Sequence, residues 1–224
     1  KKSQIQDLSE VMLPLLDKVE KIMGDDWEAS SYEMLRNLAK NPDSKWTHYT
    51  QRILREVDPH NLKTFLLNAG FEAGFMGYKT SLKMKKKYGC NIPWIILMDP
   101  TTACNLHCTG CWAAEYGNKM NLSYEMMDKI ITEGKELGIY AYLFTGGEPL
   151  IRKDDIIRLC EKHKDVAFHA FTNGTLIDEK FCQEMKRVGN FSVAISLEGF
   201  DEVNDLRRCK GVFDKVMHAM DLMK

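Results

Sequence analysis

The chain has 224 residues, of which 44% are apolar, and its 31 basic side chains are balanced by 32 acidic ones. This length and apolar content allow a buried core of one domain or somewhat more and exclude an intrinsically disordered tail. The balanced charge gives no global field that would favour nucleic acid as a partner. No stretch approaches the roughly 18 consecutive apolar residues of a membrane span, so we expect neither membrane spanning nor secretion.

Cysteine usage and the two chain ends bear on compartment and completeness. Three of the seven cysteines fall between Cys104 and Cys111, a spacing that favours metal ligation in a reducing compartment over a disulfide framework. We therefore expect a cytoplasmic protein. The sequence lacks an initiator Met and still follows a helical pattern at Lys224, which indicates a segment of a longer polypeptide.

Residues 5–88 carry apolar side chains at helical spacing, and breaks at Gly24, at Asn41-Pro42 and at Asp58-Pro59 predict about four short helices. The lysine-rich stretch Lys79 to Lys87 near the end of this region is interpreted as a solvated helix end, whose cations suit the helix dipole. The alternative for this stretch is peripheral contact with an anionic membrane surface.

From Asn91 onwards short apolar segments alternate with helical patterns, which predicts parallel strands joined by crossover helices. The expected fold class is α/β, as a barrel or an open sheet, with residues 1–90 as a helical region and 91–224 as the α/β part. A helix is expected from Ser123, with Gly138 past its end. The other helices are expected at 154–163, 178–188 and from 212, and the strands at 94–98, 140–145, 166–171 and 191–197.

The loop after the first predicted strand carries Cys104, Cys108 and Cys111 in the spacing C-x3-C-x2-C. An iron–sulfur cubane normally takes four thiolates, so three would leave one iron open to an outside ligand. The alternative is a zinc site. Its fourth ligand would come from His107, Cys90, Cys160, Cys182 or Cys209.

Polar residues follow the later strands, where parallel sheets collect their chemistry. In Gly146-Gly147-Glu148-Pro149 the glycines would let the backbone approach a ligand and the carboxylate would accept from an ammonium. Asn173 also suits an ordinary Asn-Gly turn. Ser196 and Glu198 would share one face of a strand. For Arg207 and Arg208 the alternative is a surface ion pair with Asp201, Glu202 or Asp205.

With these motifs in order, the region from Trp94 to Lys224 resembles the radical S-adenosylmethionine (SAM) superfamily, whose signature is the same cysteine loop followed by a glycine-rich motif. The resemblance implies a partial (β/α) barrel of radical SAM type, with its first four βα units present after an α-helical N-terminal region. It implies a [4Fe-4S] cluster on the three cysteines, SAM on its open iron, and a reductant such as flavodoxin or ferredoxin. The SAM contacts that it implies are Gly146, Gly147, Glu148, Pro149, Thr172, Asn173, Ser196, Glu198, Arg207 and Arg208.

The reaction implied is reductive cleavage of SAM to a 5′-deoxyadenosyl radical, which takes hydrogen from an unknown substrate in an anaerobic setting. Family members often have an aromatic residue before the third cysteine, where this chain has Gly110, with Trp112 after it. The resemblance leads us to expect the fifth and sixth strands of the usual barrel beyond Lys224. Three interpretations stay open: peptide maturation, as in SPASM-type members with a downstream Cys-rich module; modification of a lipid or small molecule; and a non-catalytic metal or redox module.

Overall fold

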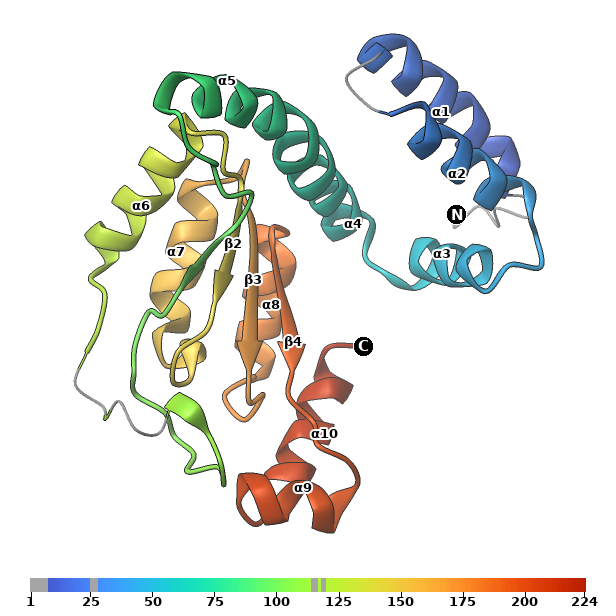
Figure 1. Cartoon of the computed structure of the whole chain (residues 1–224). Helices are drawn as coiled ribbons and strands as arrows, with labels where there is room; N and C mark the ends of the chain where they lie inside the picture. The colour runs from blue at the N-terminus through green and yellow to red at the C-terminus, as the bar shows by residue number, and fades with distance from the viewer. Residues whose placement is uncertain (1–7, 25–27, 114–116, 118–119) are drawn as a thin grey trace. The chain divides into compact units, whose positions relative to one another are not determined.

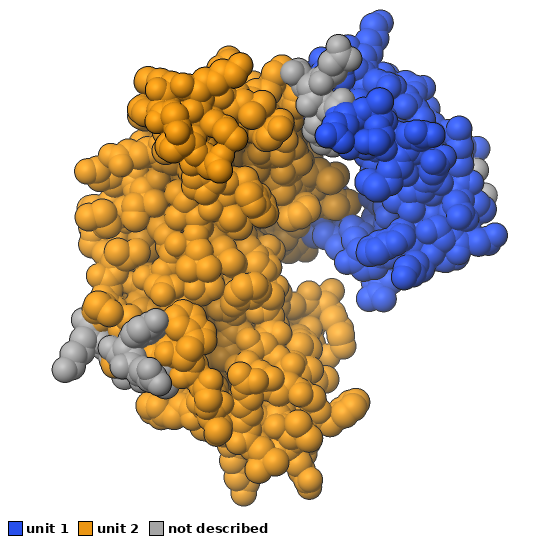
Figure 2. All heavy atoms as spheres, viewed as in Figure 1, with its two compact units in different colours: residues 1–59 blue, residues 60–224 orange. Residues whose placement is uncertain are grey.

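The computed structural model describes residues 8–24, 28–113, 117 and 120–224 (Figure 1). The chain divides into two compact units, residues 1–59 and 60–224, which Figure 2 colours separately. The helical segment 60–88 therefore groups with the strands that follow it. The boundary at residue 90 expected from the sequence marks a change of pattern and stays a prediction.

The described residues of the first unit form three helices, α1 (Leu8–Met23), α2 (Ala29–Lys40) and α3 (Lys45–Glu56). Arg36 of α2 forms ion pairs with α1, to Asp17 at 2.8 Å and to Glu20. The side chain of Ser44 caps α3 by accepting from the amide of Trp46 at 3.3 Å. The breaks predicted from the sequence separate these helices, while the predicted start at Ile5 lies outside the described residues.

A fourth helical stretch begins the second unit and runs through α4 (Pro59–Phe65), the wider-turned η2 (Leu66–Gly77) and α5 (Tyr78–Tyr88). Gly77 packs against Gly138 so closely that a Cβ on Gly77 would lie 2.3 Å from the Gly138 carbonyl oxygen. Lysines fill the exposed last turn of α5, as expected for a helix end. Nowhere in the described ranges is a helix both long and apolar enough to cross a bilayer.

The four strands pair in parallel in the order β1-β2-β3-β4. Sequential order of this kind belongs to a barrel rather than to a doubly wound sheet, whose order reverses at a switch point. The fold is α/β, a partial barrel, as predicted. The strands are β1 (Ile96–Met98), β2 (Ala141–Phe144), β3 (Ala167–Thr172) and β4 (Phe191–Ile195), mostly shorter than the predicted segments.

Helices follow the strands as the sequence indicated. Ser123 caps the first of them by accepting from the Met126 amide, and Asp178 caps a later one by accepting from the Phe181 amide. These helices are α6 (Tyr124–Glu136), α7 (Lys153–Lys162), preceded by the short η4 (Pro149–Arg152), α8 (Glu179–Val188) and α10 (Val212–Leu222).

One helix was not predicted, α9 (Asp201–Arg208), which follows β4. Its sequence has two apolar residues, Val203 and Leu206, and both are exposed. Without an apolar stripe the sequence pattern gives no helical signal here. Acidic residues in its first turn and Arg207 and Arg208 in its last suit the helix dipole instead.

The core lies between one face of the sheet and the covering helices. Alternate strand residues supply it, and the rings of Phe144 and Phe168 stack with their centroids 5.8 Å apart. Met127 and Ile131 of α6 are completely buried against them. The helices therefore cover the convex face of the sheet, and the side chains of the concave face do not belong to this core.

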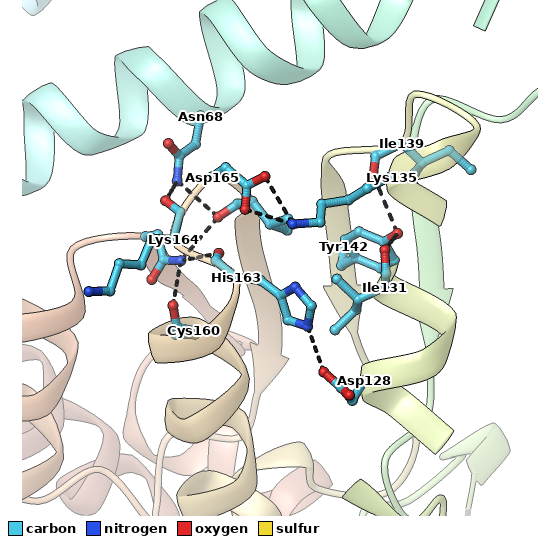
Figure 3. A network of polar contacts seen from close by, with 12 residues as sticks. Asn68, Asp128, Ile131, Lys135, Ile139, Tyr142, Cys160, His163, Lys164 and Asp165 are labelled. Atoms are coloured by element: carbon cyan, nitrogen blue, oxygen red, sulfur yellow. Dashed lines mark hydrogen bonds and ion pairs between the residues drawn. The ribbon is translucent and has the colours of Figure 1, made fainter. Parts of the chain in front are cut away.

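Buried amides close the amino ends of the strands (Figure 3). Asn68 Nδ2 of η2 donates to the carbonyl oxygens of Lys164 at 2.7 Å and Val166 at 3.0 Å. Asn190 Nδ2 lies within hydrogen-bonding distance of the carbonyl oxygens of Cys160 (3.1 Å), His163 (3.0 Å) and Val166 (3.2 Å). These amides give the turn before β3 the partners that buried backbone carbonyls require.

Charged pairs extend the same network. Lys135 Nζ lies 3.0 Å from the Asp165 carboxylate, and His163 Nε2 lies 2.8 Å from Asp128 Oδ1. The Tyr142 hydroxyl donates to the backbone oxygen of Ile131 at 3.2 Å. In barrels of this kind the amino end carries stability and the carboxyl end carries chemistry.

Candidate cluster and cofactor site

The cysteine loop leaves β1 and is held by backbone contacts. The Thr102 amide donates to the Met120 carbonyl at 2.9 Å, and the Met120 amide donates back to Thr102 Oγ1 at 3.1 Å. Arg152 Nη1 donates to the carbonyl oxygens of Pro100 (3.2 Å) and Leu122 (2.8 Å). The sequence reasoning did not single out Arg152 or Thr102, since neither spacing nor charge distinguishes them from surface residues.

The three thiols are free and lie near one another. Burial raises the pKa of Cys104 and of Cys108, and the charge of Arg208 opposes the rise at Cys108. Cys111 adds a further upward influence on the pKa of both thiols. The Leu106 amide points at Cys104 Sγ from 3.5 Å. A sulfur with an amide donor and a nearby guanidinium suits a thiolate ligand.

Within the part of the chain that the structure describes, no group of three His, Cys, Asp or Glu side chains is close enough to hold a metal ion. A cubane spreads its thiolates more widely than a single ion does. Three half-buried thiols on one loop with a nearby cation fit an anionic iron–sulfur cluster, because soft thiolates are its ligands.

The glycine-rich loop after β2 docks on the cysteine loop. The amides of Gly147 and Glu148 donate to the carbonyl oxygens of Thr101 (3.0 Å) and Ala103 (2.8 Å). A Cβ on Gly147 would lie 2.1 Å from the Ala103 carbonyl oxygen. The glycines were expected to let backbone approach a ligand, and here they let two loop backbones approach each other.

Glu148 is only 1% exposed. Its carboxylate accepts from the Leu150 amide at 2.9 Å, from Thr172 Oγ1 at 2.7 Å and from the Asn173 amide at 2.8 Å. Burial raises the pKa of Glu148, and these hydrogen bonds and Arg208 oppose the rise. In this arrangement the carboxylate joins the ends of β2 and β3, and its direct contact with SAM stays a prediction.

Asn173 joins the end of β3 to the cysteine loop. Its Nδ2 donates to Asn105 Oδ1 at 2.9 Å and lies 4.0 Å from Cys104 Sγ. Asn105 Nδ2 in turn donates to Thr175 Oγ1 at 2.8 Å. Thr172 and Pro149 are buried, as Glu148 is, so they pack beneath the loops.

After β4 the expected residues pair with one another. Arg208 donates to Glu198 Oε1 from Nη2 at 2.6 Å, and Arg207 Nη1 donates to Glu198 Oε2 at 3.0 Å. Among the described residues both arginines thus form their ion pairs with Glu198, and not with Asp201, Glu202 or Asp205, the alternative partners considered from the sequence. Ser196 and Glu198 lie past the end of β4 at Ile195, so strand alternation does not govern their directions.

Gly110 has a φ of +70°, a left-handed conformation between the second and third thiols. A larger side chain there would be strained, so this conformation favours a glycine at position 110. Trp112 and His107 are exposed.

The remaining cysteines differ in surroundings. Cys160 is buried in the core and Cys182 packs at its edge, whereas Cys90 is exposed. Cys209 is exposed too, but its Sγ lies 3.8 Å from the carbonyl oxygen of His107 in the cysteine loop. It has a φ of 86°, the one positive value among the described non-glycine residues.

Comparisons with known proteins agree with this geometry. The sequence model of the Radical SAM superfamily matches residues 98–224. An uncharacterized protein of Archaeoglobus fulgidus is 39% identical over 129 residues, 55% of this chain and 30% of that protein. The Fe-coproporphyrin III synthase of Methanosarcina barkeri is 35% identical over 132 residues, 56% of this chain and 33% of the enzyme.

Among solved structures, Streptococcus suis SuiB bound to S-adenosylmethionine has a TM-score of 0.54 at 16% identity, covering 91% of this chain and 42% of its own. That likeness concerns the fold. The chain spans about a third of the length of the two curated relatives named above. Proteins of the matched family are enzymes that bind a [4Fe-4S] cluster and S-adenosylmethionine, and that require a reductant and a substrate. This chain belongs to the radical SAM superfamily.

Proposed function

We propose that the chain is the cluster-binding and SAM-binding part of a radical SAM enzyme, with Cys104, Cys108 and Cys111 as the cluster ligands. The observation that carries this proposal is the joining of all four strand ends around one loop of free thiols. When bound, the cluster supplies the electron that cleaves SAM to methionine and a 5′-deoxyadenosyl radical, which takes hydrogen from a substrate C–H bond.

In this proposal the protein's own side chains and amides hold and orient the cluster ligands. Asn173 and the Leu106 amide fix Cys104, while Glu148 fixes Asn173 through its backbone amide. Arg208, whose side chain is 13% exposed, lies where its charge acts on both Cys108 and Glu148. In this structure Arg208 Nε and Nη2 both contact Glu198 Oε1. We assign to Arg208 the pairing with the SAM carboxylate in place of these contacts, since guanidinium groups bind carboxylates through two parallel hydrogen bonds.

The proposed SAM contacts thus fall into two groups. We assign direct contact with SAM to Gly146, Gly147, Ser196, Glu198, Arg207 and Arg208. We assign support of these residues to Pro149, Glu148, Thr172 and Asn173, which are buried.

The decisive experiment uses the full-length protein, reconstituted anaerobically with iron and sulfide and reduced with dithionite. Release of 5′-deoxyadenosine is expected. A preparation that binds iron and sulfide but never cleaves SAM would leave a non-catalytic redox module as the function. Each guanidinium contacts Glu198, but Arg208 is half-buried whereas Arg207 is exposed. Arg208→Gln should therefore weaken SAM binding by roughly 10-fold or more and Arg207→Gln by less than about 3-fold.

The candidate substrates are a peptide and a small molecule. The name of the Methanosarcina barkeri relative, a porphyrin synthase, is compatible with a small molecule. A run of cysteines downstream of Lys224 would favour a peptide. A cytoplasmic, anaerobic setting and a flavodoxin or ferredoxin as electron donor complete the proposal.

A further inference from the structure

The sheet has a second face that the core does not use. Side chains on a strand alternate between faces, so Leu97, Leu143 and His169 point away from the helices that cover Met98 and Phe144. The strand register places Leu97 beside Leu143, Leu143 beside His169, and His169 beside Ser192. One row of side chains therefore crosses all four strands on the concave face of the partial barrel.

A second row lies one step nearer the cofactor loops. Phe171 pairs with Ala194 in the register, and Phe171 is 50% exposed, while Leu97 in the first row is 58% exposed. At the edge of the same face the Thr145 hydroxyl donates to Asp99 Oδ1 at 2.6 Å. The concave face is thus apolar in its middle, with hydrogen-bonding groups at a few positions, which is the usual character of a ligand-binding surface.

The polar group within this apolar face is a histidine–serine pair. His169 Nδ1 lies 2.8 Å from Ser192 Oγ, and Ser192 Oγ donates to the Phe168 carbonyl at 3.4 Å. Serine has one hydroxyl proton. Both contacts are hydrogen bonds at once only if Ser192 gives that proton to Phe168 and His169 donates from Nδ1.

This arrangement fixes what the other ring nitrogen can do. Burial lowers the pKa of His169, which favours the neutral ring near pH 7. A neutral ring with its proton on Nδ1 has a bare Nε2, which accepts hydrogen bonds and cannot donate them. The edge-on contact with Phe171, at 5.6 Å between ring centroids, supports the ring from the side of the cofactor loops.

The depth of His169 suits contact with a substrate. It precedes Thr172, the last residue of β3, by three positions, or about 10 Å of strand. A molecule lying on the concave face could thus touch His169 at one end and present a C–H bond to the carboxyl end of the sheet at the other.

We propose that His169 Nε2 is a substrate-binding hydrogen-bond acceptor on the concave face, and that it selects a largely apolar substrate carrying an N–H or O–H donor. The inference rests on the proposed function and names the substrate class of that same site. It follows from the register, the two Ser192 contacts and the apolar neighbours Leu97, Leu143 and Phe171.

The first test is the ring tautomer. In the full-length protein, reconstituted and labelled with ¹⁵N-histidine, the nitrogen resonances of His169 should show a protonated Nδ1 and a bare Nε2. Ser192→Ala should abolish this preference, because it removes the hydroxyl that holds Nδ1. A protonated Nε2 in the wild-type protein would overturn the proposal.

The second test compares indole with 1-methylindole, which has the same apolar body without the N–H donor, by NMR titration of the full-length protein. Indole should bind roughly 3- to 10-fold more tightly, as expected for one neutral hydrogen bond. In His169→Phe the preference for indole should disappear, whereas the exposed control His218→Phe should keep the wild-type ratio.

Equal affinities in the wild-type protein, no binding of either probe, or a ratio that survives in His169→Phe would each overturn the inference. Dithionite-driven release of 5′-deoxyadenosine from the same wild-type preparation tests the proposed function separately. Release without indole discrimination refutes only the histidine assignment, and discrimination without release refutes only the enzymatic function.

Discussion

At the amino ends of the strands, Asn68, Asn190 and the pairs Lys135–Asp165 and His163–Asp128 bind backbone and one another, whereas the carboxyl ends present free thiols and a guanidinium pair. The two ends of the same parallel sheet thus have different tasks: the amino end stabilises the fold, and the carboxyl end carries the candidate site. The amide nitrogens and the charged groups of these amino-end residues bind partners inside the fold. Polar groups at the carboxyl end hold loops in positions that leave sulfur and cationic groups available.

The strongest way to break this comparison is Cys108→Ala. We expect loss of the brown iron–sulfur chromophore and of all SAM cleavage, because the change removes one of the three thiolates proposed to hold the cluster. The unfolding midpoint of the protein before reconstitution should stay close to that of the wild type. Exposed Cys90→Ala is the matched control and should keep chromophore and activity. Full activity of Cys108→Ala would refute the ligand assignment.

Gly147→Ala should affect both tasks at once. Its Cβ would meet the Ala103 carbonyl oxygen at 2.1 Å, so the glycine-rich loop has to move off the cysteine loop. We expect a loss of about 1–3 kcal/mol in unfolding free energy, measured by denaturant titration, together with a lower iron content after reconstitution. Gly70→Ala, with nothing within 4 Å of its Cβ, should be neutral or stabilising by up to about 1 kcal/mol. Wild-type iron content in Gly147→Ala would contradict the docking role.

Asn190→Ala tests the amino end alone. Its Nδ2 lies within hydrogen-bonding distance of three buried carbonyl oxygens, so its removal should lower the unfolding free energy by about 1–3 kcal/mol. The folded fraction should bind as much iron as the wild type. Exposed Asn91→Ala should change stability by less than about 0.5 kcal/mol. A loss of iron without a loss of stability would reverse the proposed division of tasks.

The smallest effect concerns pH. Burial lowers the pKa of His163 below its ordinary 6.5, although Asp128 opposes the shift. The unfolded chain therefore binds a proton more readily, and stability falls as pH drops through about 6.5. Denaturant midpoints should decrease between about pH 7.5 and about pH 5.5. His163→Gln should reduce this slope without abolishing it, because burial lowers the pKa of His169 in the same direction. If the pH dependence of the denaturant midpoint were the same in His163→Gln as in the wild type, His163 would not contribute to it.

Much of this organisation was predictable from the sequence. Apolar segments with β-branched and aromatic residues marked the four strands, and Ser123 and Asp178 marked two helix starts. The cysteine spacing and the glycine-rich motif located the loops of the candidate site. These signals are local, so periodicity and turn chemistry carry them.

What could not be predicted depends on contacts between distant residues. Nothing near Glu148 indicates that its carboxylate would be buried against β3, nor does the sequence around Asn173 indicate a bond to Asn105. The pairing of Arg207 and Arg208 with Glu198 depends on α9, which has no apolar stripe to announce it. Long-range polar contacts of this kind leave no periodic trace.

The short helix α9 is bound directly to the cysteine loop. The Thr109 amide, between the second and third thiols, donates to the Arg207 carbonyl oxygen at 2.7 Å. Through that hydrogen bond, the cysteine loop and the last turn of α9 should move together. A displacement of α9 would therefore be transmitted to the positions of Cys108 and Cys111, two of the proposed cluster ligands.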